Sequence, residues 1–305
     1  MSTTVVKNAA WVVAWDRSEK RHVYKKDVDI AFSGSSVTHV GKGYAGPADK
    51  TIDGRDLMVM PGLVDIHSHP TSEPGNKGLL EELGSPRLGM SSLYEFMPIF
   101  RLPPEAATAA TQVAISEMLK SGVTTYVDIS AARPNWADEV AATGIRAVLA
   151  PAFRSASWST GDGKTVAYHW DEPAGKKGLD AAVDLVKRAN QHPSGRVSAM
   201  LAPSQLDTCT PELMRSARDA ARDLGVPFQI HAAQSVVEFQ EITRRHGKTP
   251  IEFLDSVGLL GPDLIIGHGI FLNDHPWIHW PGADDRSEEH TSELQSRFGI
   301  SYAVF

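Results

Sequence analysis

The chain has 305 residues, of which 42% are hydrophobic and 22% charged, as is ordinary for a globular protein. Its formal net charge of −7 argues against nucleic acid or an anionic membrane as the main partner, because both require a basic face. The single cysteine, Cys209, excludes an internal disulfide, and no run approaches the ~20 apolar residues that span a bilayer, so we expect a cytoplasmic protein.

Short strands are predicted for the first 58 residues. Segments rich in β-branched and apolar residues are separated by glycines such as Gly34, Gly41 and Gly54, which favour turns. The predicted strands are 5–14, 28–32, 37–40 and 57–60. We therefore expect residues 1–58 to form a small β unit.

From Val59 onward the pattern changes to strands that alternate with helices. The strand candidates are 59–66, 124–129, 145–153, 197–205, 227–233 and 264–270. The helix candidates are 104–121, 136–142, 179–190, 211–224 and 235–246. Strands that are nearly all apolar and flanked by helices indicate parallel strands buried on both faces. A (β/α)₈ TIM barrel has eight such units in roughly 250 residues. The sequence therefore predicts an α/β fold in which 59–285 form an incomplete barrel of about six units.

The end of the sequence offers a reason for the missing units. Residues 286–296 resemble the translation of a common sequencing-library adaptor, and 300–305 resemble its continuation in the same frame. A natural polar helix with a short strand is the alternative. Because two blocks match in one order and one frame, we interpret 286–305 as an adaptor-derived tail, leave it out of the fold prediction and expect the natural protein to be longer.

Two histidines, His67 and His69, follow the first apolar strand of the barrel. Strand residues two apart share one face with Cα atoms roughly 6.6 Å apart, so their imidazoles can converge on one ion. The spacing alone is weak, since chance gives about 0.5 such pairs in a chain with this many histidines. Its position is informative, because barrel enzymes place their chemistry at the carboxyl ends of the strands. We therefore interpret the pair as metal ligands.

The segment Pro61-Gly-Leu-Val-Asp-Ile-His-Ser-His69 resembles the Pro-Gly-hydrophobic-hydrophobic-Asp-x-His-x-His signature of the amidohydrolase superfamily. The resemblance covers most of residues 1–280 and is greatest to the triazine hydrolase, aminohydrolase and cytosine-deaminase-like branch. It implies that residues 1–58 are the N-terminal half of a composite β-sandwich, whose second half follows the barrel in the family.

The same resemblance implies roles for two later histidines. His231 ends the fifth strand candidate, where the family places its third metal-binding histidine. His268 ends the sixth, where the family uses a histidine on a metal or, in members with one metal, on the substrate and the nucleophilic water. We expect His231 to be a ligand and His268 to be a catalytic residue of the second kind.

The number of metals follows from a missing residue. Family members with two metals use a carboxylated lysine at the end of the fourth strand, but no lysine occurs between Lys187 and Lys248. The resemblance therefore implies one divalent ion, Zn²⁺ or Fe²⁺, since neutral imidazoles suit both. Such an ion lowers the pKa of water towards ~7, which produces a nucleophile for a carbon that bears a nitrogen or another leaving group.

The general base is expected outside the sequence given. Family members use an aspartate after the eighth strand to take the proton of the water, and that strand lies beyond the six predicted here. Asp274, Asp284 and Asp285 fall in the wrong place to replace it. We therefore expect the 305-residue chain to be inactive even if it binds metal.

Residue 234 departs from the family. Deaminases with one metal usually carry a glutamate three residues after the fifth-strand histidine, which donates a proton to the leaving group. Gln234 has no titratable proton, but its amide can orient a substrate. Gln205, at the tip of the fourth strand, is a second candidate for substrate binding, and Glu73 and Lys77 are weaker ones. Glu238 is expected on the following helix, facing away.

The leading hypothesis is thus a hydrolase for carbon–nitrogen bonds, other than peptide bonds, of a cyclic amidine, amide or heteroaromatic small molecule. Hydrolytic dechlorination or another displacement on a heteroaromatic ring is an alternative that Gln234 supports. A catalytically dead relative that acts as a scaffold is a third, although it need not retain four histidines. A homo-oligomer of the full-length protein is compatible with the sequence and is left open.

Overall fold

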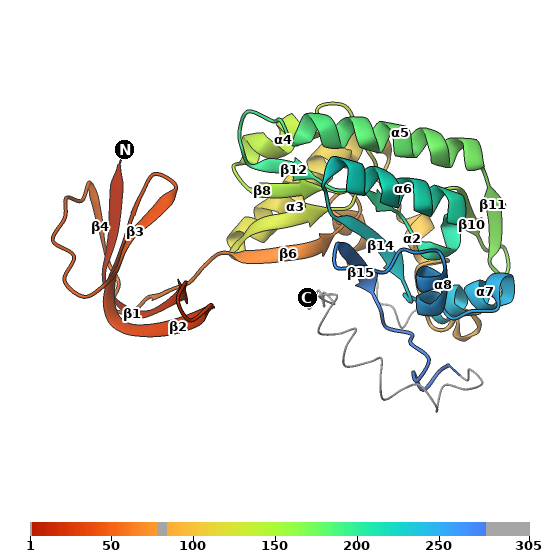
Figure 1. Ribbon diagram of the computed structural model, residues 1–305, viewed down its shortest axis with the longest axis horizontal. Helices are drawn as coiled ribbons and strands as arrows, with labels where there is room; N and C mark the ends of the chain where they lie inside the picture. Colours follow the sequence, from red (N-terminus) through yellow and green to blue (C-terminus); the bar gives the residue numbers. More distant parts are fainter. Residues whose placement is uncertain (1, 78–83, 279–305) are drawn as a thin grey trace. The chain divides into compact units, whose positions relative to one another are not determined.

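The computed structural model describes residues 2–77 and 84–278, so the adaptor-like segment 286–305 lies outside the described residues. The chain divides between Leu63 and Val64 into two compact units. Among the helices described, none is both long enough and apolar enough to cross a membrane. The fold is mixed α/β, as predicted (Figure 1).

The N-terminal unit is a five-stranded sheet. Its strands are β1 (Thr3–Asp16), β2 (Arg21–Ser33), β3 (Ser36–Gly41), β4 (Lys50–Asp53) and β5 (Met58–Val59). The order is β3-β2-β1-β4, with β1 and β2 antiparallel and β4 and β5 parallel to β1. Val6, Val12 and Ile30 are buried in its apolar cluster. The hairpin of β1 and β2 is longer than predicted, and β4 was not predicted.

A β-bulge interrupts β1 between Val6 and Ala9, where Asn8 adopts a left-handed backbone conformation with φ 53°. The carboxylate of Asp29 fills this bulge and accepts bonds from the backbone N–H of Asn8 at 2.9 Å and of Tyr44 at 2.8 Å. The ammonium of Lys7 donates a third at 2.9 Å. Burial opposes ionisation of Asp29, but the three donors outweigh it and lower its pKa.

The second unit contains the parallel strands. They are β6 (Leu63–Ser68), β7 (Val123–Asp128), β8 (Arg146–Leu149), β9 (Ala152–Phe153), β12 (Val197–Ala199), β13 (Ala202–Pro203), β14 (Phe228–Ala232) and β15 (Leu264–His268). The order β12-β8-β7-β6 forms one sheet, β9 pairs with β13, and β14 pairs with β15. Parallel bridges from Leu201 to Phe228 and from Gln205 to His231 connect the fourth predicted strand to the fifth.

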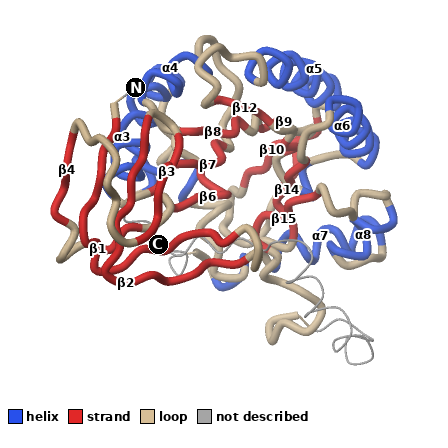
Figure 2. Tube along the Cα trace, turned by 60° about the vertical axis from the view of Figure 1, so that its left-hand side comes forward, coloured by secondary structure: helices blue, strands red, loops and turns tan. Residues whose placement is uncertain are grey.

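Helices follow the strands and lie along their outer side (Figure 2). They are α3 (Ala107–Lys120), α4 (Trp136–Thr143), α5 (Glu172–Ala189), α6 (Pro211–Leu224), α7 (Val236–His246) and α8 (Pro250–Ser256). The shorter ones are α1 (Glu73–Asn76), α2 (Phe96–Ile99), η2 (Pro86–Leu88), η3 (Pro104–Ala106) and η4 (Leu206–Thr208). The large apolar core lies between strands and helices and includes the fully buried Trp136, Tyr126 and Phe228.

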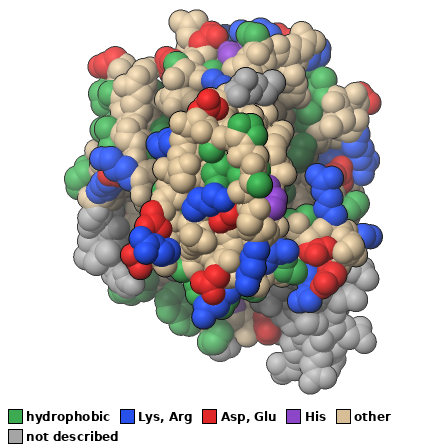
Figure 3. Space-filling view, turned by 90° about the vertical axis from the view of Figure 1, so that its left-hand side faces the viewer, with side chains coloured by type: hydrophobic (Ala, Val, Ile, Leu, Met, Phe, Trp, Pro, Cys, Tyr) green, Lys and Arg blue, Asp and Glu red, His purple; other side chains and the backbone are tan. Residues whose placement is uncertain are grey.

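Two features of this unit differ from the sequence prediction. Helix α5 begins at Glu172, seven residues before the predicted start at 179, because the carboxylate of Asp171 caps it by accepting the N–H of Ala174 at 2.9 Å. The segment between β9 and α5 forms an antiparallel hairpin of β10 (Ala156–Ser159) and β11 (Ala167–Trp170). On the face drawn in Figure 3, Lys and Arg side chains lie among Asp and Glu instead of forming one continuous basic surface.

Candidate metal centre

Four histidines meet at the carboxyl ends of β6, β14 and β15. His67 lies at the end of β6 and His69 just beyond it, His231 lies in β14, and His268 ends β15. The ring centroids of His67 lie 5.1 Å from those of His69 and His268 and 4.7 Å from that of His231. The structure thus brings together all four histidines that the sequence singled out.

The imidazole rings of His69 and His231 approach each other with their Nε2 atoms 3.3 Å apart. Nδ1 of His69 donates to the carbonyl of Ile129 at 2.9 Å, and Nδ1 of His231 donates to the carbonyl of Ser204. Because a carbonyl oxygen only accepts, both protons are on Nδ1 and both Nε2 atoms carry lone pairs. Two nitrogens bound to one tetrahedral ion at about 2.1 Å lie about 3.4 Å apart, so this separation fits a shared cation.

Burial keeps these rings neutral. Desolvation, followed by the charges of the neighbouring histidines, lowers the pKa of His67 to about 3 and that of His268 to about 3. Desolvation likewise lowers the pKa of His69, and it lowers the pKa of His231 well below the usual value. Metal binding requires neutral imidazoles, so the cluster is in the protonation state that a cation needs at neutral pH.

His67, His69 and His231 form the set that can hold an ion, because one nitrogen from each lies within 4.8 Å of the others. Nε2 of His67 is buried and has no hydrogen-bond partner among the described residues. The donor set is therefore complete for a three-histidine site, and these residues fit a divalent metal ion. His268 does not belong to this set, although its Nε2 is also buried without a described partner.

The backbone is strained where β15 ends. His268 has φ 75°, in the left-handed region that non-glycine residues rarely adopt. The N–H of Gly269 donates to the carbonyl of Ala232 at 3.0 Å, which ties this turn to β14. Strain of this kind is characteristic of functional positions.

The lack of a side chain at Gly267 leaves space for the imidazole of His67. A Cβ at residue 267 would lie 2.7 Å from Cε1 and 3.2 Å from Nδ1 of His67, and 3.5 Å from Cδ2 of His231. The first separation is too short for any real contact, so only glycine permits β15 to approach the imidazole this closely.

A cavity of about 620 Å³ opens at the histidines. It is lined by both predicted substrate-binding residues, Gln205 and Gln234. Nε2 of Gln205 and Oε1 of Gln234 are buried and have no partner among the described residues, so each is available to a ligand. Glu73 also lines the cavity, but its carboxylate accepts the N–H of His69 at 2.8 Å. Lys77 does not line it and pairs with Glu117 on the surface.

Glu238, the carboxylate nearest Gln234 in the sequence after it, does not line the cavity either. It is fully buried and accepts the backbone N–H groups of Ala233 and Gln234, each at 2.8 Å. Desolvation, together with the charge of Asp207, raises its pKa well above the usual value. Glu238 thus holds the loop that carries Gln234 in place.

Two cationic side chains of this cavity were not predicted, namely Arg101 and Arg154. Desolvation and the charge of Arg101 lower the pKa of Arg154, whose guanidinium lies 5.3 Å from the ring centre of Trp158. Arg101 lies in the segment between α2 and η3, for which the strand and helix pattern carried no signal. Arg154 comes directly after β9, so its position at the carboxyl end of a predicted strand was a signal that could have identified it.

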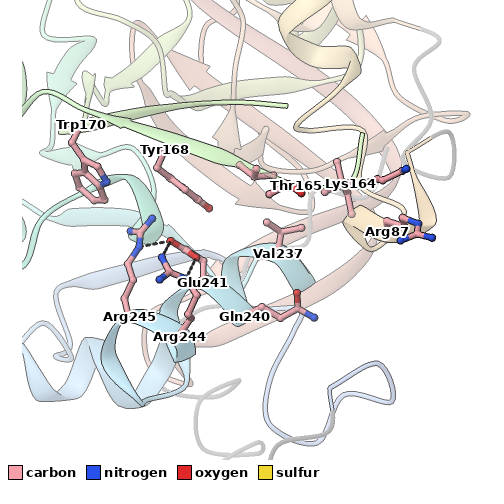
Figure 4. Close-up of a pocket in the computed structure, with 12 residues that line it drawn as sticks. Arg87, Lys164, Thr165, Tyr168, Trp170, Val237, Gln240, Glu241, Arg244 and Arg245 are labelled. Atoms are coloured by element: carbon pink, nitrogen blue, oxygen red, sulfur yellow. Dashed lines mark hydrogen bonds and ion pairs between the residues drawn. The ribbon is translucent and has the colours of Figure 1, made fainter. Parts of the chain in front are cut away.

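A second cavity, of about 550 Å³, lies beside α7 and contains none of the four histidines. In Figure 4, Arg244 and Arg245 converge on Glu241, whose Oε1 lies 2.7 Å from Nη2 of Arg244 and 2.5 Å from Nε of Arg245. The guanidinium of Arg245 also lies over the rings of Tyr168 and Trp170. The guanidinium groups of Arg244 and Arg245 are thus engaged with Glu241 and with aromatic rings of the protein.

Comparison with known proteins agrees with this geometry. The sequence profile of the amidohydrolase family matches residues 58–293. A 5-methylthioadenosine/S-adenosylhomocysteine deaminase 2 from Archaeoglobus fulgidus is 32% identical over 248 residues, which are 81% of this chain and 55% of the relative. A 5'-deoxyadenosine deaminase from Methanosarcina mazei is 28% identical over 280 residues, 90% of this chain and 59% of the relative. The chain therefore spans little more than half the length of these relatives.

Solved structures share the fold. Atrazine chlorohydrolase from Arthrobacter aurescens TC1, complexed with zinc, superposes with a TM-score of 0.67 at 19% identity, covering 87% of this chain and 60% of that one. An adenosine deaminase from Xanthomonas campestris with bound zinc superposes with a TM-score of 0.65 at 21% identity, covering 88% and 57%.

Proposed function

The chain belongs to the amidohydrolase family, and we propose that it is a metal-dependent hydrolase of carbon–nitrogen bonds other than peptide bonds. The substrate class is a small heteroaromatic or cyclic amidine molecule. The relatives named as deaminases of adenosine derivatives make an exocyclic amine of such a ring the first leaving group to test.

One observation carries this proposal: the lone pairs of His69 and His231 face each other across 3.3 Å, with His67 beside them, inside a 620 Å³ cavity. Two lone pairs repel at this distance unless a cation or a proton lies between them. Desolvation lowers the pKa of both rings and so disfavours a shared proton near pH 7, which supports a cation between the two nitrogens.

The proposed ligands are His67, His69 and His231, and the proposed ion is a single Zn²⁺ or Fe²⁺. When bound, such an ion supplies the Lewis acidity that lowers the pKa of water towards ~7. The protein's own contribution is to hold three neutral imidazoles in place, two of them through bonds from Nδ1 to backbone carbonyls.

The remaining cavity residues have proposed roles toward the substrate. His268 presents a buried, unpartnered Nε2 and is the candidate to hold or move a proton at the substrate and the attacking water. Gln205 and Gln234 are proposed to bind the substrate, because each presents an unpaired amide atom at the cavity. An amide can orient a ring nitrogen but cannot donate a proton to a departing amine as an acid does.

Beyond the mixed α/β class, we propose that the parallel strands of residues 59–285 are part of a (β/α)₈ TIM barrel. We also propose that residues 1–58 are half of a composite β-sandwich. Strands β6, β7, β8 and β12 lie side by side in chain order, bridges join the fourth predicted strand to β14, and β14 pairs with β15, which supports the first assignment.

Metal analysis tests the centre. After incubation with Zn²⁺ and exhaustive dialysis, the chain should retain about one ion, measured by plasma mass spectrometry. The triple variant H67A/H69A/H231A should retain none. Full occupancy in that variant would place the ion elsewhere, and no zinc in the wild-type chain would favour a catalytically dead scaffold.

Product analysis separates the two chemistries. On the complete gene product, ammonia release from 5'-deoxyadenosine or 5-methylthioadenosine supports deamination. Chloride release from a chlorotriazine without ammonia release supports hydrolytic dechlorination, the alternative that Gln234 favours by lacking a titratable proton.

A further inference from the structure

Gln229 lies against the histidine cluster, and none of the roles assigned above involves it. It precedes His231 by two residues in β14, so the two side chains share one face of the strand. The residue is 1% exposed, and its amide lies 2.8 Å from Nδ1 of His67. Burying a polar side chain this completely costs free energy unless the side chain forms hydrogen bonds, and its bond to His67 is the one described.

The direction of this hydrogen bond decides which nitrogen of His67 can bind a cation. If the amide N–H of Gln229 donates, Nδ1 is the acceptor and the proton of the neutral ring is on Nε2. The buried Nε2 of His67 would then present a proton, with no described group to accept it. If the amide oxygen accepts instead, the proton is on Nδ1 and Nε2 presents a lone pair.

The two ends of an amide have nearly the same shape, so the position of Gln229 permits both directions. Either direction leaves one amide atom of Gln229 without a described partner, since Oε1 has none when Nε2 bonds to His67. The amide alone therefore does not decide. The metal site distinguishes the two directions, because only the second gives Nε2 of His67 a lone pair like those on Nε2 of His69 and His231.

We propose that Gln229 is a positioning residue that accepts the Nδ1–H of His67 and thereby directs the Nε2 lone pair toward the cation. The inference rests on the metal centre proposed above. It completes a pattern, because His69 and His231 are oriented in the same way by the carbonyls of Ile129 and Ser204. For His67 the acceptor is a side chain, so it can be removed without changing the backbone.

Zinc affinity tests the assignment. The dissociation constant of the 305-residue chain for Zn²⁺ is measured by competition with a chromogenic chelator for the wild type, Gln229→Leu and Gln229→Glu. Leucine keeps most of the volume and removes the acceptor, so affinity should fall 10- to 100-fold, as is typical for an outer partner of a metal ligand. An ionised glutamate can only accept, so at a pH where its carboxylate is ionised the affinity should stay at the wild-type level or tighten.

The outcomes separate the inference from the proposed function. Wild-type affinity in Gln229→Leu overturns the positioning role, and a loss in Gln229→Glu equal to that in Gln229→Leu overturns the acceptor direction. No zinc binding by the wild type refutes the metal centre, and the role of Gln229 falls with it. Circular dichroism verifies folding, and Gln112→Leu, on the exposed face of α3, is the matched control that should bind zinc normally.

Discussion

Replacing Gly267 with alanine should weaken metal binding without touching a ligand. The added Cβ would lie 2.7 Å from Cε1 of His67, whereas carbon atoms in contact lie at about 3.5–4.0 Å. The imidazole must therefore retreat by roughly 0.8 Å, several times the ~0.2 Å tolerance of a metal–ligand distance. Since the ring is displaced and not removed, we expect the affinity for Zn²⁺ to fall about 10- to 100-fold, as when an outer partner is lost.

The same displacement has a measurable effect on stability. Stabilisation by a saturating ligand grows with the logarithm of concentration over Kd, so this loss reduces the zinc-dependent gain in unfolding free energy by about 1.4–2.7 kcal/mol. Overpacking should cost the metal-free protein a further ~1–3 kcal/mol. Zinc competition and denaturant unfolding with and without zinc measure the two effects separately.

Gly161→Ala is the matched control. No atom lies within 4 Å of a Cβ at residue 161, and its backbone is not in the left-handed region, so its zinc affinity and stability should remain those of the wild type. If Gly267→Ala binds zinc as tightly as Gly161→Ala does, the ring of His67 is not at the ligand position and the reasoning is refuted.

Two further predictions concern other parts of the chain. His268→Ala should retain about one zinc per chain but reduce turnover by the complete gene product roughly 10²- to 10⁴-fold, as for a lost proton-transfer group; loss of the metal would make His268 a ligand instead. Asp29→Asn should lower the unfolding free energy of the N-terminal unit by about 1.5–3 kcal/mol at pH 7. Because folding lowers the pKa of Asp29, the stabilisation by its carboxylate is present above about pH 4 and is lost as the pH falls further. The difference in unfolding free energy between the wild type and Asp29→Asn should therefore shrink in acid. A difference that stays constant with pH would contradict this role of Asp29.

The local parts of the fold were predictable because they depend on periodicity and caps. Strands β6, β14 and β15, which carry His67, His231 and His268, were found from apolar runs, and α6 begins at Pro211 as predicted, where the side chain of Thr210 caps it. The early start of α5 carried a local signal as well, since Asp171 followed by Glu172-Pro173 is a typical helix start. The hairpin of β10 and β11 carried little, because its short strands lack clear alternation.

The residues around the proposed metal ligands were less predictable from the sequence than the ligands themselves. Glu73 and Lys77 looked equivalent as loop charges, yet only Glu73 lies in the cavity, because the turn after β6 brings its carboxylate back to the N–H of His69. For Gln229 a signal did exist: a polar residue two positions before His231 in a strand otherwise apolar must face the same interior. The pattern gave its direction, but its partner, 162 residues away, depends on the register of the strands.

The strand order explains why the histidines need such close packing. In the described order β6 and β15 stand at opposite ends, and the cluster takes His67 and His69 from the end of β6, His268 from β15 and His231 from β14 beside it. No backbone hydrogen bonds between β6 and β15 are described, so no ladder fixes the distance between the side chains of these two strands. Gly267 allows β15 to reach the ring of His67, and the amide of Gln229 holds that ring from β14. The imidazoles of His67, His69 and His231 thus meet through packing and through single hydrogen bonds to their Nδ1 atoms, and the proposed cation would relieve the repulsion between their lone pairs.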